Sequence, residues 1–158
     1  MSSVPVTKHG AELLKAELHQ LKTVERRTVI NAIAEARSHG ELSEYAEYDA
    51  AKERQSFVEG RIAEIESKLA TATIIDVTKL ANAGRVVFGA TVHLMNLDSE
   101  EQVVYQIVGV DEADIRAGKI SVASPIARAL IGKEPDEVIQ VNAPGGVMEY
   151  EILKVEYI

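Results

Sequence analysis

The sequence of 158 residues contains no cysteine and no tryptophan, and it has only two phenylalanines and five tyrosines. Without cysteine the chain can form neither disulfide bonds nor thiolate metal sites, which suits the cytosol. Residues 1–6 lack the basic residues and the apolar run of a signal peptide. No stretch approaches the roughly 20 apolar residues of a membrane span. We therefore expect a soluble, cytoplasmic protein with no membrane partner.

Positive charge is also scarce relative to negative charge. The chain has 17 lysines and arginines against 25 acidic residues, a formal net charge of −8. Proteins that bind duplex nucleic acid through their own field neutralise phosphates with basic residues, so this balance argues against that class. The four histidines show no ligand spacing, and no glycine-rich phosphate loop follows a strand pattern. The sequence shows no self-contained active site.

The first half of the chain has a helical period. Thr7 is a suitable N-cap for a helix over residues 8–39, and Gly40 is a suitable residue to end it. Residues 25–28 (Glu-Arg-Arg-Thr) interrupt the apolar seam of this helix, which predicts weaker packing there. The seam residues on either side of the interruption are Leu14, Leu18, Leu21, Val29, Ala32, Ile33 and Ala36.

A second helix follows after a short connection. Its seam alternates steps of three and four residues, as in an antiparallel coiled coil, and Gln55 is its only plainly polar member. Because the connection is short, the two helices must be antiparallel neighbours. A helix of about 30 residues at 1.5 Å per residue is roughly 45 Å long. The seam residues are Tyr48, Ala51, Gln55, Val58, Ile62, Ile65, Leu69 and Ala72.

From Gly84 onward the period changes to two, which predicts β-strands. Ser124 and Pro125 predict the start of one helix, as N-cap and first helical residue, and Gly132 predicts its end. The expected strands cover residues 86–88, 91–95, 103–108, 119–122, 137–142 and 147–157.

The two periods together predict an α+β fold. We expect an antiparallel coiled-coil hairpin over residues 1–76, a linker over 77–83, and a strongly bent antiparallel sheet with one packed helix over 84–158.

Four carboxylates lie at the reversal between the two helices. A turn does not need such a cluster, whose members repel one another. Glu41 and Glu44 would together offer two oxygens to one Mg²⁺, which usually takes one or two protein carboxylates. The alternative for Glu44 and Glu47 is that they follow Ser43 as N-cap and stabilise the helix dipole, by about 0.3–1 kcal/mol each. Asp49 fits a solvated surface.

Basic residues lie about one turn below these acids. Arg37 belongs to the first helix and Lys52 to the second. One interpretation is ordinary pairing with neighbouring acids. The other is that Arg37 and Lys52 hold a single nucleic-acid strand beside a metal. The pattern leaves both interpretations open.

Several long segments resemble the bacterial Gre-type transcript cleavage factors, of the GreA kind, and the resemblance runs essentially end to end. The segments are IAEAR (33–37), AEYDAAKE (46–53), EGRI (59–62), IDV (75–77) and SPIARALIGK (124–133).

The resemblance implies a coiled coil followed by a C-terminal domain similar to FK506-binding proteins. It implies that the coiled coil enters the secondary channel of RNA polymerase and that the C-terminal domain docks on the polymerase rim. There Glu41 and Glu44 would help to hold a Mg²⁺ shared with the polymerase, beside the 3′ end of backtracked nascent RNA that Arg37 and Lys52 contact. Two metals stabilise the attacking and leaving oxygens of phosphodiester cleavage. The chain would thus be no enzyme itself, would bind no cofactor alone, and would be monomeric when free.

The sequence departs from the family pattern at two positions of the reversal. Glu41 stands where the family usually has Asp, and Tyr45 stands where it usually has Asn. A carboxylate displaced by about an ångström can lower a rate about 100-fold. A second hypothesis is therefore a paralogue that occupies the channel and modulates or inhibits the polymerase.

A third hypothesis is a proline isomerase or chaperone built on the C-terminal half. The scarcity of aromatic residues argues against an aromatic-lined proline pocket. The acids of this half that are candidates for a polymerase-docking surface, or for a solvated loop, are Asp111, Glu112 and Asp114.

Overall fold

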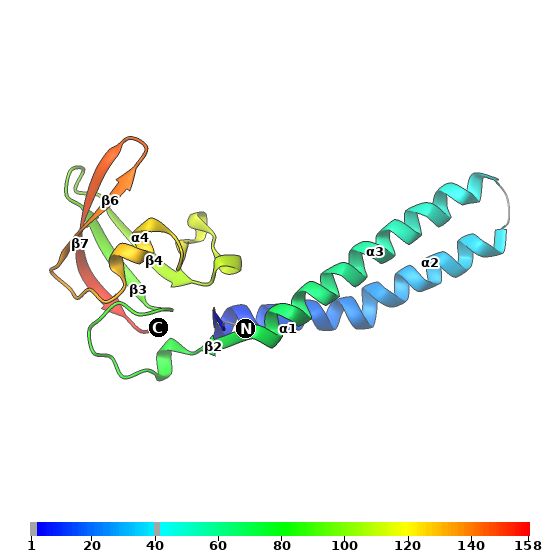
Figure 1. The fold of residues 1–158 in the computed structure, drawn as a ribbon, viewed down its shortest axis with the longest axis horizontal. Coiled ribbons are helices and arrows are strands. Elements are labelled where there is room, and N and C mark those ends of the chain that lie inside the picture. Colours follow the sequence, from blue (N-terminus) through cyan, green and yellow to red (C-terminus); the bar gives the residue numbers. More distant parts are fainter. Residues whose placement is uncertain (1–2, 40–41) are drawn as a thin grey trace. The chain divides into compact units, whose positions relative to one another are not determined.

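The structure is a computed structural model that describes residues 3–39 and 42–158, with residues 39 and 42–44 described by their backbone only. The chain divides into two compact units (Figure 1). Among the described residues, the first unit is Ala11–Ala72, and the second combines residues 3–10 with Thr73–Ile158. Helices make the first unit, and a curled sheet with one helix makes most of the second, which confirms the α+β class. The expected domain boundaries at residues 76 and 84 stay a prediction.

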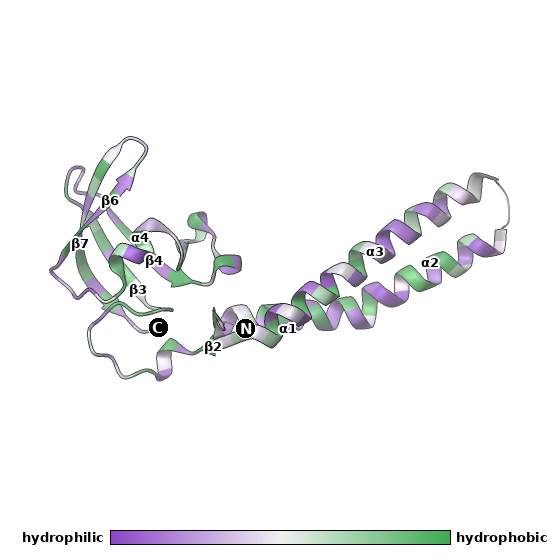
Figure 2. Cartoon of the chain, viewed as in Figure 1, coloured by the Kyte–Doolittle hydropathy of each residue, from purple (hydrophilic) through white to green (hydrophobic). Residues whose placement is uncertain are grey.

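The hairpin consists of α1 (Lys8–Gln20), the π-helical segment η1 (Leu21–Glu25), α2 (Arg26–His39) and α3 (Leu42–Thr71). Thr7 is the N-cap of α1, as expected, because its Oγ1 accepts a hydrogen bond of 3.0 Å from the Gly10 N–H. Hydrophilic and hydrophobic positions alternate along both arms of the hairpin (Figure 2), so its apolar seam is narrow. The buried residues that pack into one cluster along that seam are Leu21, Val29, Val58, Ile62 and Ile65.

The segment η1 explains the interruption at residues 25–28. In the first arm, the residues that face α3 follow one another by steps of four after Leu21, at Glu25, Val29 and Ile33. A coiled coil would alternate steps of three and four. A π-helical turn takes up one extra residue, so the seam keeps facing α3. Leu21 and Val29 belong to one buried cluster, so the seam continues across η1. Ala32 was expected in the seam, but it is exposed.

The seam of α3 is as expected. All eight predicted seam positions are buried or half-buried, including the polar Gln55. Each coiled-coil step brings the next apolar side chain to the same face, so periodicity alone located this surface. The last of the eight, Ala72, lies in the short strand β2 (Ala72–Ile75), which forms a two-stranded sheet with β1 (Val4–Thr7).

The second unit is built on a five-stranded sheet in the order β5-β4-β3-β7-β6. Neighbouring strands are antiparallel except β4 and β5, which are parallel, so the expectation of a wholly antiparallel sheet is corrected. A register shift between His93 and Leu94 marks a bulge where β3 meets β7. The strands are β3 (Thr91–Asn96), β4 (Gln102–Val108), β5 (Lys119–Ser121), β6 (Val138–Ala143) and β7 (Gly146–Glu156).

The expected strand at 86–88 is wrong. Val86 is buried, but its N–H donates to the Lys133 carbonyl at 2.8 Å and its carbonyl accepts from Gly132 N–H at 2.9 Å. This pair joins the segment to the residues after α4 (Pro125–Leu130), not to the sheet. A short apolar run predicts burial but not which partner its backbone takes.

The start and end of α4 match their sequence signals. Ser124 Oγ accepts from the Ala127 N–H at 3.3 Å, and Pro125 occupies the first turn. Gly132 follows the helix with φ of +87°, a left-handed conformation that favours glycine. The helix covers the core face of the sheet, where Leu94, Ile107 and Leu130 are fully buried. Three short 3₁₀ helices complete the unit: η2 (Val77–Lys79), η3 (Val110–Glu112) and η4 (Ile115–Ala117).

Candidate functional site

The end of the hairpin carries the predicted acids. The first arm ends at His39 and α3 begins at Leu42, so Gly40 and Glu41 are the only residues between the two helices in the sequence. Glu41, one of the two predicted metal ligands, lies outside the described residues. Glu44, the other, is the third residue of α3 and is described by its backbone.

The start of α3 favours negative charge. The first turn of a helix leaves backbone N–H groups without helical partners, and the helix dipole makes this end positive. Glu44 lies in this turn, and Glu47 follows one turn later with an exposed side chain. Ser43 was expected to be the N-cap, but α3 already includes Leu42, so Ser43 lies inside the helix. An acid in this turn therefore stabilises the helix whatever else it binds.

The predicted RNA-contacting Arg37 has an aromatic partner. Its guanidinium carbon lies over the Tyr48 ring at 5.7 Å from the ring centroid, which is a cation–π contact between α2 and α3. Tyr48 is half-buried in the seam, so it holds the guanidinium against the hairpin. This contact pairs none of the guanidinium N–H donors with an acceptor oxygen. Such donors suit a phosphate.

The predicted RNA-contacting Lys52 is exposed, and its ammonium donates to the Gln55 side-chain oxygen at 3.0 Å. Both residues belong to α3, one turn apart. The described contacts of Arg37 and Lys52 are thus to neutral groups, and neither is an ion pair. A neutral partner leaves the charge of a basic residue uncompensated at that contact, so it remains available to an anion.

Tyr45 is an aromatic residue near the hairpin end. Its side chain is 59% exposed, on the first turns of α3. It therefore belongs neither to the buried core nor to the seam.

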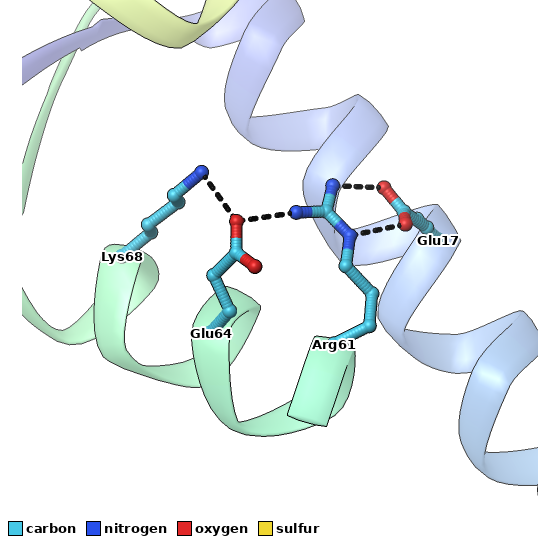
Figure 3. Close-up of polar contacts among 4 residues, drawn as sticks. All are labelled: Glu17, Arg61, Glu64 and Lys68. Carbon is cyan, nitrogen blue, oxygen red and sulfur yellow. Dashed lines mark hydrogen bonds and ion pairs between the residues drawn. The ribbon is translucent and has the colours of Figure 1, made fainter. Parts of the chain in front are cut away.

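Ion pairs join the two arms of the hairpin below its end. Arg61 of α3 makes two hydrogen bonds with Glu17 of α1, at 2.6 and 2.7 Å, and a third with Glu64 at 2.8 Å (Figure 3). Lys68 reaches the same Glu64 oxygen at 3.0 Å. The Arg61 hydrogen bonds lower the pKa of Glu17, and the Lys68 hydrogen bond is the main cause of the lowered pKa of Glu64.

Two further pairs lie at the C-terminal end of the π-helical turn. Arg26 makes paired hydrogen bonds of 2.8 Å with Glu59, and these lower the pKa of that carboxyl. Arg54 contacts Glu25 at 3.2 Å and lies over the Phe57 ring at 5.6 Å. Arg54 and Arg61 of α3 thus each pair with an acid of the first arm. The helical period of each arm does not show which residues of the other arm its charged side chains face.

The described residues contain no group of three or more His, Asp or Glu side chains that could hold a metal ion. Within the same residues, no helix has the length and apolar character needed to cross a membrane. The predicted tip ligands, Glu41 and Glu44, are carboxylates, the donor type that Mg²⁺ prefers. Two carboxylates fit a shared magnesium site, in which another molecule supplies the remaining ligands.

The acids expected on a docking loop have internal partners. Asp114 Oδ1 accepts from the Arg116 N–H at 3.2 Å and so caps η4. Glu112 is half-buried and accepts hydrogen bonds from Thr7 and Gly109. These two side chains therefore serve the fold of the second unit.

Both parts of the chain match models of known families. The model described as transcription elongation factor, N-terminal, matches residues 4–74, and that described as transcription elongation factor, GreA/GreB, C-term, matches residues 81–157. Transcription elongation factor GreA of Neisseria meningitidis serogroup B (strain ATCC BAA-335 / MC58) is 63% identical over 158 residues, 100% of both chains. The protein of that name from Pasteurella multocida (strain Pm70) is 62% identical over 157 residues, 99% of both.

A similar solved structure is that of GreA factor homolog 1 (Gfh1) of Thermus thermophilus. It is 27% identical, the alignment covers 98% of this chain and 99% of that one, and the TM-score is 0.44.

Proposed function

This chain belongs to the GreA/GreB family of transcription elongation factors, and from that premise we propose that its hairpin enters the secondary channel of RNA polymerase. There it stimulates the polymerase's own cleavage of backtracked nascent RNA, which releases arrested complexes. The chain contributes side chains to that reaction and is not itself the nuclease.

One observation carries the proposal: α3 begins at Leu42 and continues for 30 residues, with Glu44 in its first turn. The hairpin is thin because only a narrow seam of residues is buried. Ion pairs between the arms, such as Glu17–Arg61 and Arg26–Glu59, hold α3 against the first arm. A thin helix pair that is held together by ion pairs and has acids at one end is suited to carrying carboxylates into a channel.

The acids would act as ligands. Glu41 and Glu44 would supply two of the oxygens around a Mg²⁺ that the polymerase also holds. When bound there, this metal would orient a water for attack and stabilise the oxygens of the phosphodiester. Positive charge at the start of α3 keeps negative charge favourable at Glu44. Because this chain and the polymerase would each supply ligands to the same Mg²⁺, cleavage would be stimulated only in the complex of the two.

The basic residues would hold the RNA. Arg37 lies over the Tyr48 ring, which positions its guanidinium, and this contact leaves its N–H donors available to a phosphate. Lys52 provides a second positive charge on α3. Together they would bind phosphates of the displaced 3′ segment and place the scissile bond beside the acids. Positioning of this kind can supply much of a rate enhancement.

Tyr45 favours a second candidate function, in which the chain occupies the channel and modulates the polymerase without efficient cleavage. Its ring is exposed near the end of the hairpin, where the family usually has a compact amide. Glu41 adds to this case, since its longer side chain places the carboxylate differently from aspartate. A ring of this size would contact the walls of a narrow channel and alter the approach of the acids.

Transcript cleavage by stalled elongation complexes tests the proposal. We expect wild-type protein to stimulate cleavage strongly. We expect the double variant Glu41→Ala, Glu44→Ala to bind the polymerase normally and to lose stimulation by 100-fold or more, on the order expected for misplaced catalytic groups. Asp49→Asn is the matched control, because Asp49 is an exposed acid further along α3. Unchanged cleavage by the double variant would exclude the metal role.

The variants Glu41→Asp and Tyr45→Asn separate the two candidate functions. If the chain is a cleavage factor, the wild type should already stimulate cleavage, and neither variant should be needed for stimulation. If it is an occupying modulator, restoring the family residues should create stimulation that the wild type lacks.

A further inference from the structure

A half-buried carboxylate joins distant segments of the second unit. Glu112, at the end of η3, accepts hydrogen bonds of 3.0 Å at Oε2 from the backbone N–H groups of both Thr7 and Gly109. Its Oε1 accepts from the Thr7 hydroxyl. Both oxygens of one carboxylate are thus engaged, and Thr7 is held at two points.

Thr7 links this carboxylate to the start of α1. While its hydroxyl donates to Glu112, its oxygen accepts from the Gly10 N–H at 3.0 Å and so caps the helix. Thr7 is only 7% exposed. Among the described residues it is the one polar residue that is buried. A buried hydroxyl with both a donor and an acceptor partner has a fixed orientation. The negative charge of Glu112 also lies beside the positive end of the α1 dipole.

Two glycines make room for the carboxylate. A Cβ added at Gly10 would overlap the Glu112 side chain. A Cβ added at Gly109 would lie 2.8 Å from Glu112 Oε2 and 2.8 Å from the Pro5 carbonyl oxygen. Neither glycine has a positive φ. Glycine is therefore required at both positions because a larger side chain would not fit, and not because of the backbone conformation. The segment 5–10 and the loop 109–112 are therefore shaped around one side chain.

The position of this cluster in the chain gives it a consequence for the hairpin. The chain passes from the second unit into the first after Gly10, inside α1, and it returns after Ala72. Residues 8–10 form the first turn of α1, which then continues into the hairpin. A side chain that fixes Thr7 and this first turn to the sheet unit also fixes the root of the hairpin's first helix.

We propose that Glu112 is a positioning residue that holds Thr7 and the first turn of α1 in place within the sheet unit, and that RNA polymerase binds the chain in which this turn is formed. This inference rests on the proposed function, in which the chain binds the polymerase. The apparent affinity for a partner falls with the fraction of molecules that hold the binding-competent conformation. Loss of the anchor then weakens binding without changing chemistry at the hairpin end.

The anchor itself is tested by native-state amide hydrogen exchange. For E112A we expect protection of the Thr7 and Gly109 amides to fall about 10- to 100-fold, the range for hydrogen bonds to a charged group. E112Q should lose less, because its amide keeps one acceptor oxygen. E101Q, which removes the same charge at an exposed position of the same unit, is the control and should leave both amides protected.

Gly10→Ala provides a test that leaves the carboxylate in place. In the wild-type background its methyl group displaces Glu112, so we expect the same loss of protection at Gly109. In the E112A background the methyl meets no carboxylate, so the second substitution should have no further effect. Independent losses in the double variant would show that Gly10 and Glu112 are not coupled.

The positioning role is tested by polymerase binding and by cleavage in parallel. We expect E112A to raise the Kd of the full-length protein for RNA polymerase core, measured by fluorescence anisotropy, about tenfold, because fewer molecules hold the first turn of α1 in place. The cleavage rate at saturating E112A should equal that of the wild type. T7V should reproduce the effect of E112A, and T7S, which retains the hydroxyl, should restore binding.

The outcomes separate this inference from the proposed function. Lost amide protection with a raised Kd supports the anchor. Retained protection, or lost protection with an unchanged Kd, overturns it. A wild-type protein that binds the polymerase but does not stimulate cleavage overturns the proposed function, while the Kd of E112A still decides the anchor.

Discussion

The two units of this chain are stabilised in different ways. The sheet unit has a core to which all five strands and α4 contribute, with Leu94, Ile107 and Ile152 fully buried. The hairpin buries a single row of side chains between its arms and adds ion pairs on both sides of that row. A two-helix structure has too little interior for a core of the first kind. The hairpin is therefore the part whose stability depends more on charge, and it is also the part that carries the candidate site.

The largest expected effect is the loss of unfolding free energy when one buried isoleucine of each unit is replaced by alanine. Ile152→Ala should destabilise the sheet unit by about 2–5 kcal/mol, because its neighbours on all sides hold the cavity open. Ile65→Ala should destabilise the hairpin near the lower end of that range, because two helices can move together and close the gap. Hydrogen exchange followed separately in each unit measures both. A larger loss for Ile65→Ala would contradict the comparison.

A smaller effect is expected from the ion pair that joins α1 to α3. Glu17 and Arg61 should show a coupling free energy of about 0.2–1 kcal/mol in a double-mutant cycle with Glu17→Gln and Arg61→Met. The paired geometry at 2.6 and 2.7 Å places it toward the upper end. The matched control is the pair of Lys22 and Glu66, whose single contact of 3.4 Å should show weaker coupling. Urea unfolding followed by helical circular dichroism gives the values, and equal coupling for both pairs would refute the geometric argument.

The smallest expected effect is the loss of hairpin stability when each paired carboxylate is protonated at low pH. The pKa of Glu17 and of Glu59 is lowered in the folded protein by hydrogen bonds from Arg61 and Arg26. Their contribution to stability is therefore fully present above the ordinary pKa of about 4.5 and is lost as pH falls through the lower, folded pKa. We expect the urea midpoint of the hairpin to fall between pH 4.5 and pH 2, and the fall to be smaller in Arg61→Met. A hairpin equally stable at both pH values would show that the pairs contribute nothing.

The comparison of the two units also shows what could be read from the sequence. The seam of α3, from Tyr48 to Leu69, was predicted residue by residue because a helix repeats its faces with a fixed period. Thr7 and Ser124 were predicted as N-caps because capping depends on neighbouring residues only. The predicted site residues Arg37 and Lys52 lie on the two arms of the hairpin. The metal role of Glu41 and Glu44 stays a prediction.

The failures involve partners distant in sequence. The strand expected at 86–88 instead pairs its backbone with the residues after α4. The π-helical turn at 21–25 was seen only as an interruption, since a helical period does not reveal how an extra residue is accommodated. The closest partner of Arg61 is Glu17 on the first arm, 44 residues away in the sequence, which no local pattern indicates.

By itself the sequence determined where the helices and most of the strands lie, which faces they bury, and that acids gather at the reversal of the hairpin. These features follow from local periodicity and from the chemistry of neighbouring residues. Only the tertiary structure decided that Glu112 holds Thr7 and the first turn of α1, that Arg37 lies over the Tyr48 ring, and that the seam continues across a π turn. Such contacts join segments up to 105 residues apart, and no local pattern encodes which of many possible partners the folded chain brings within hydrogen-bond distance.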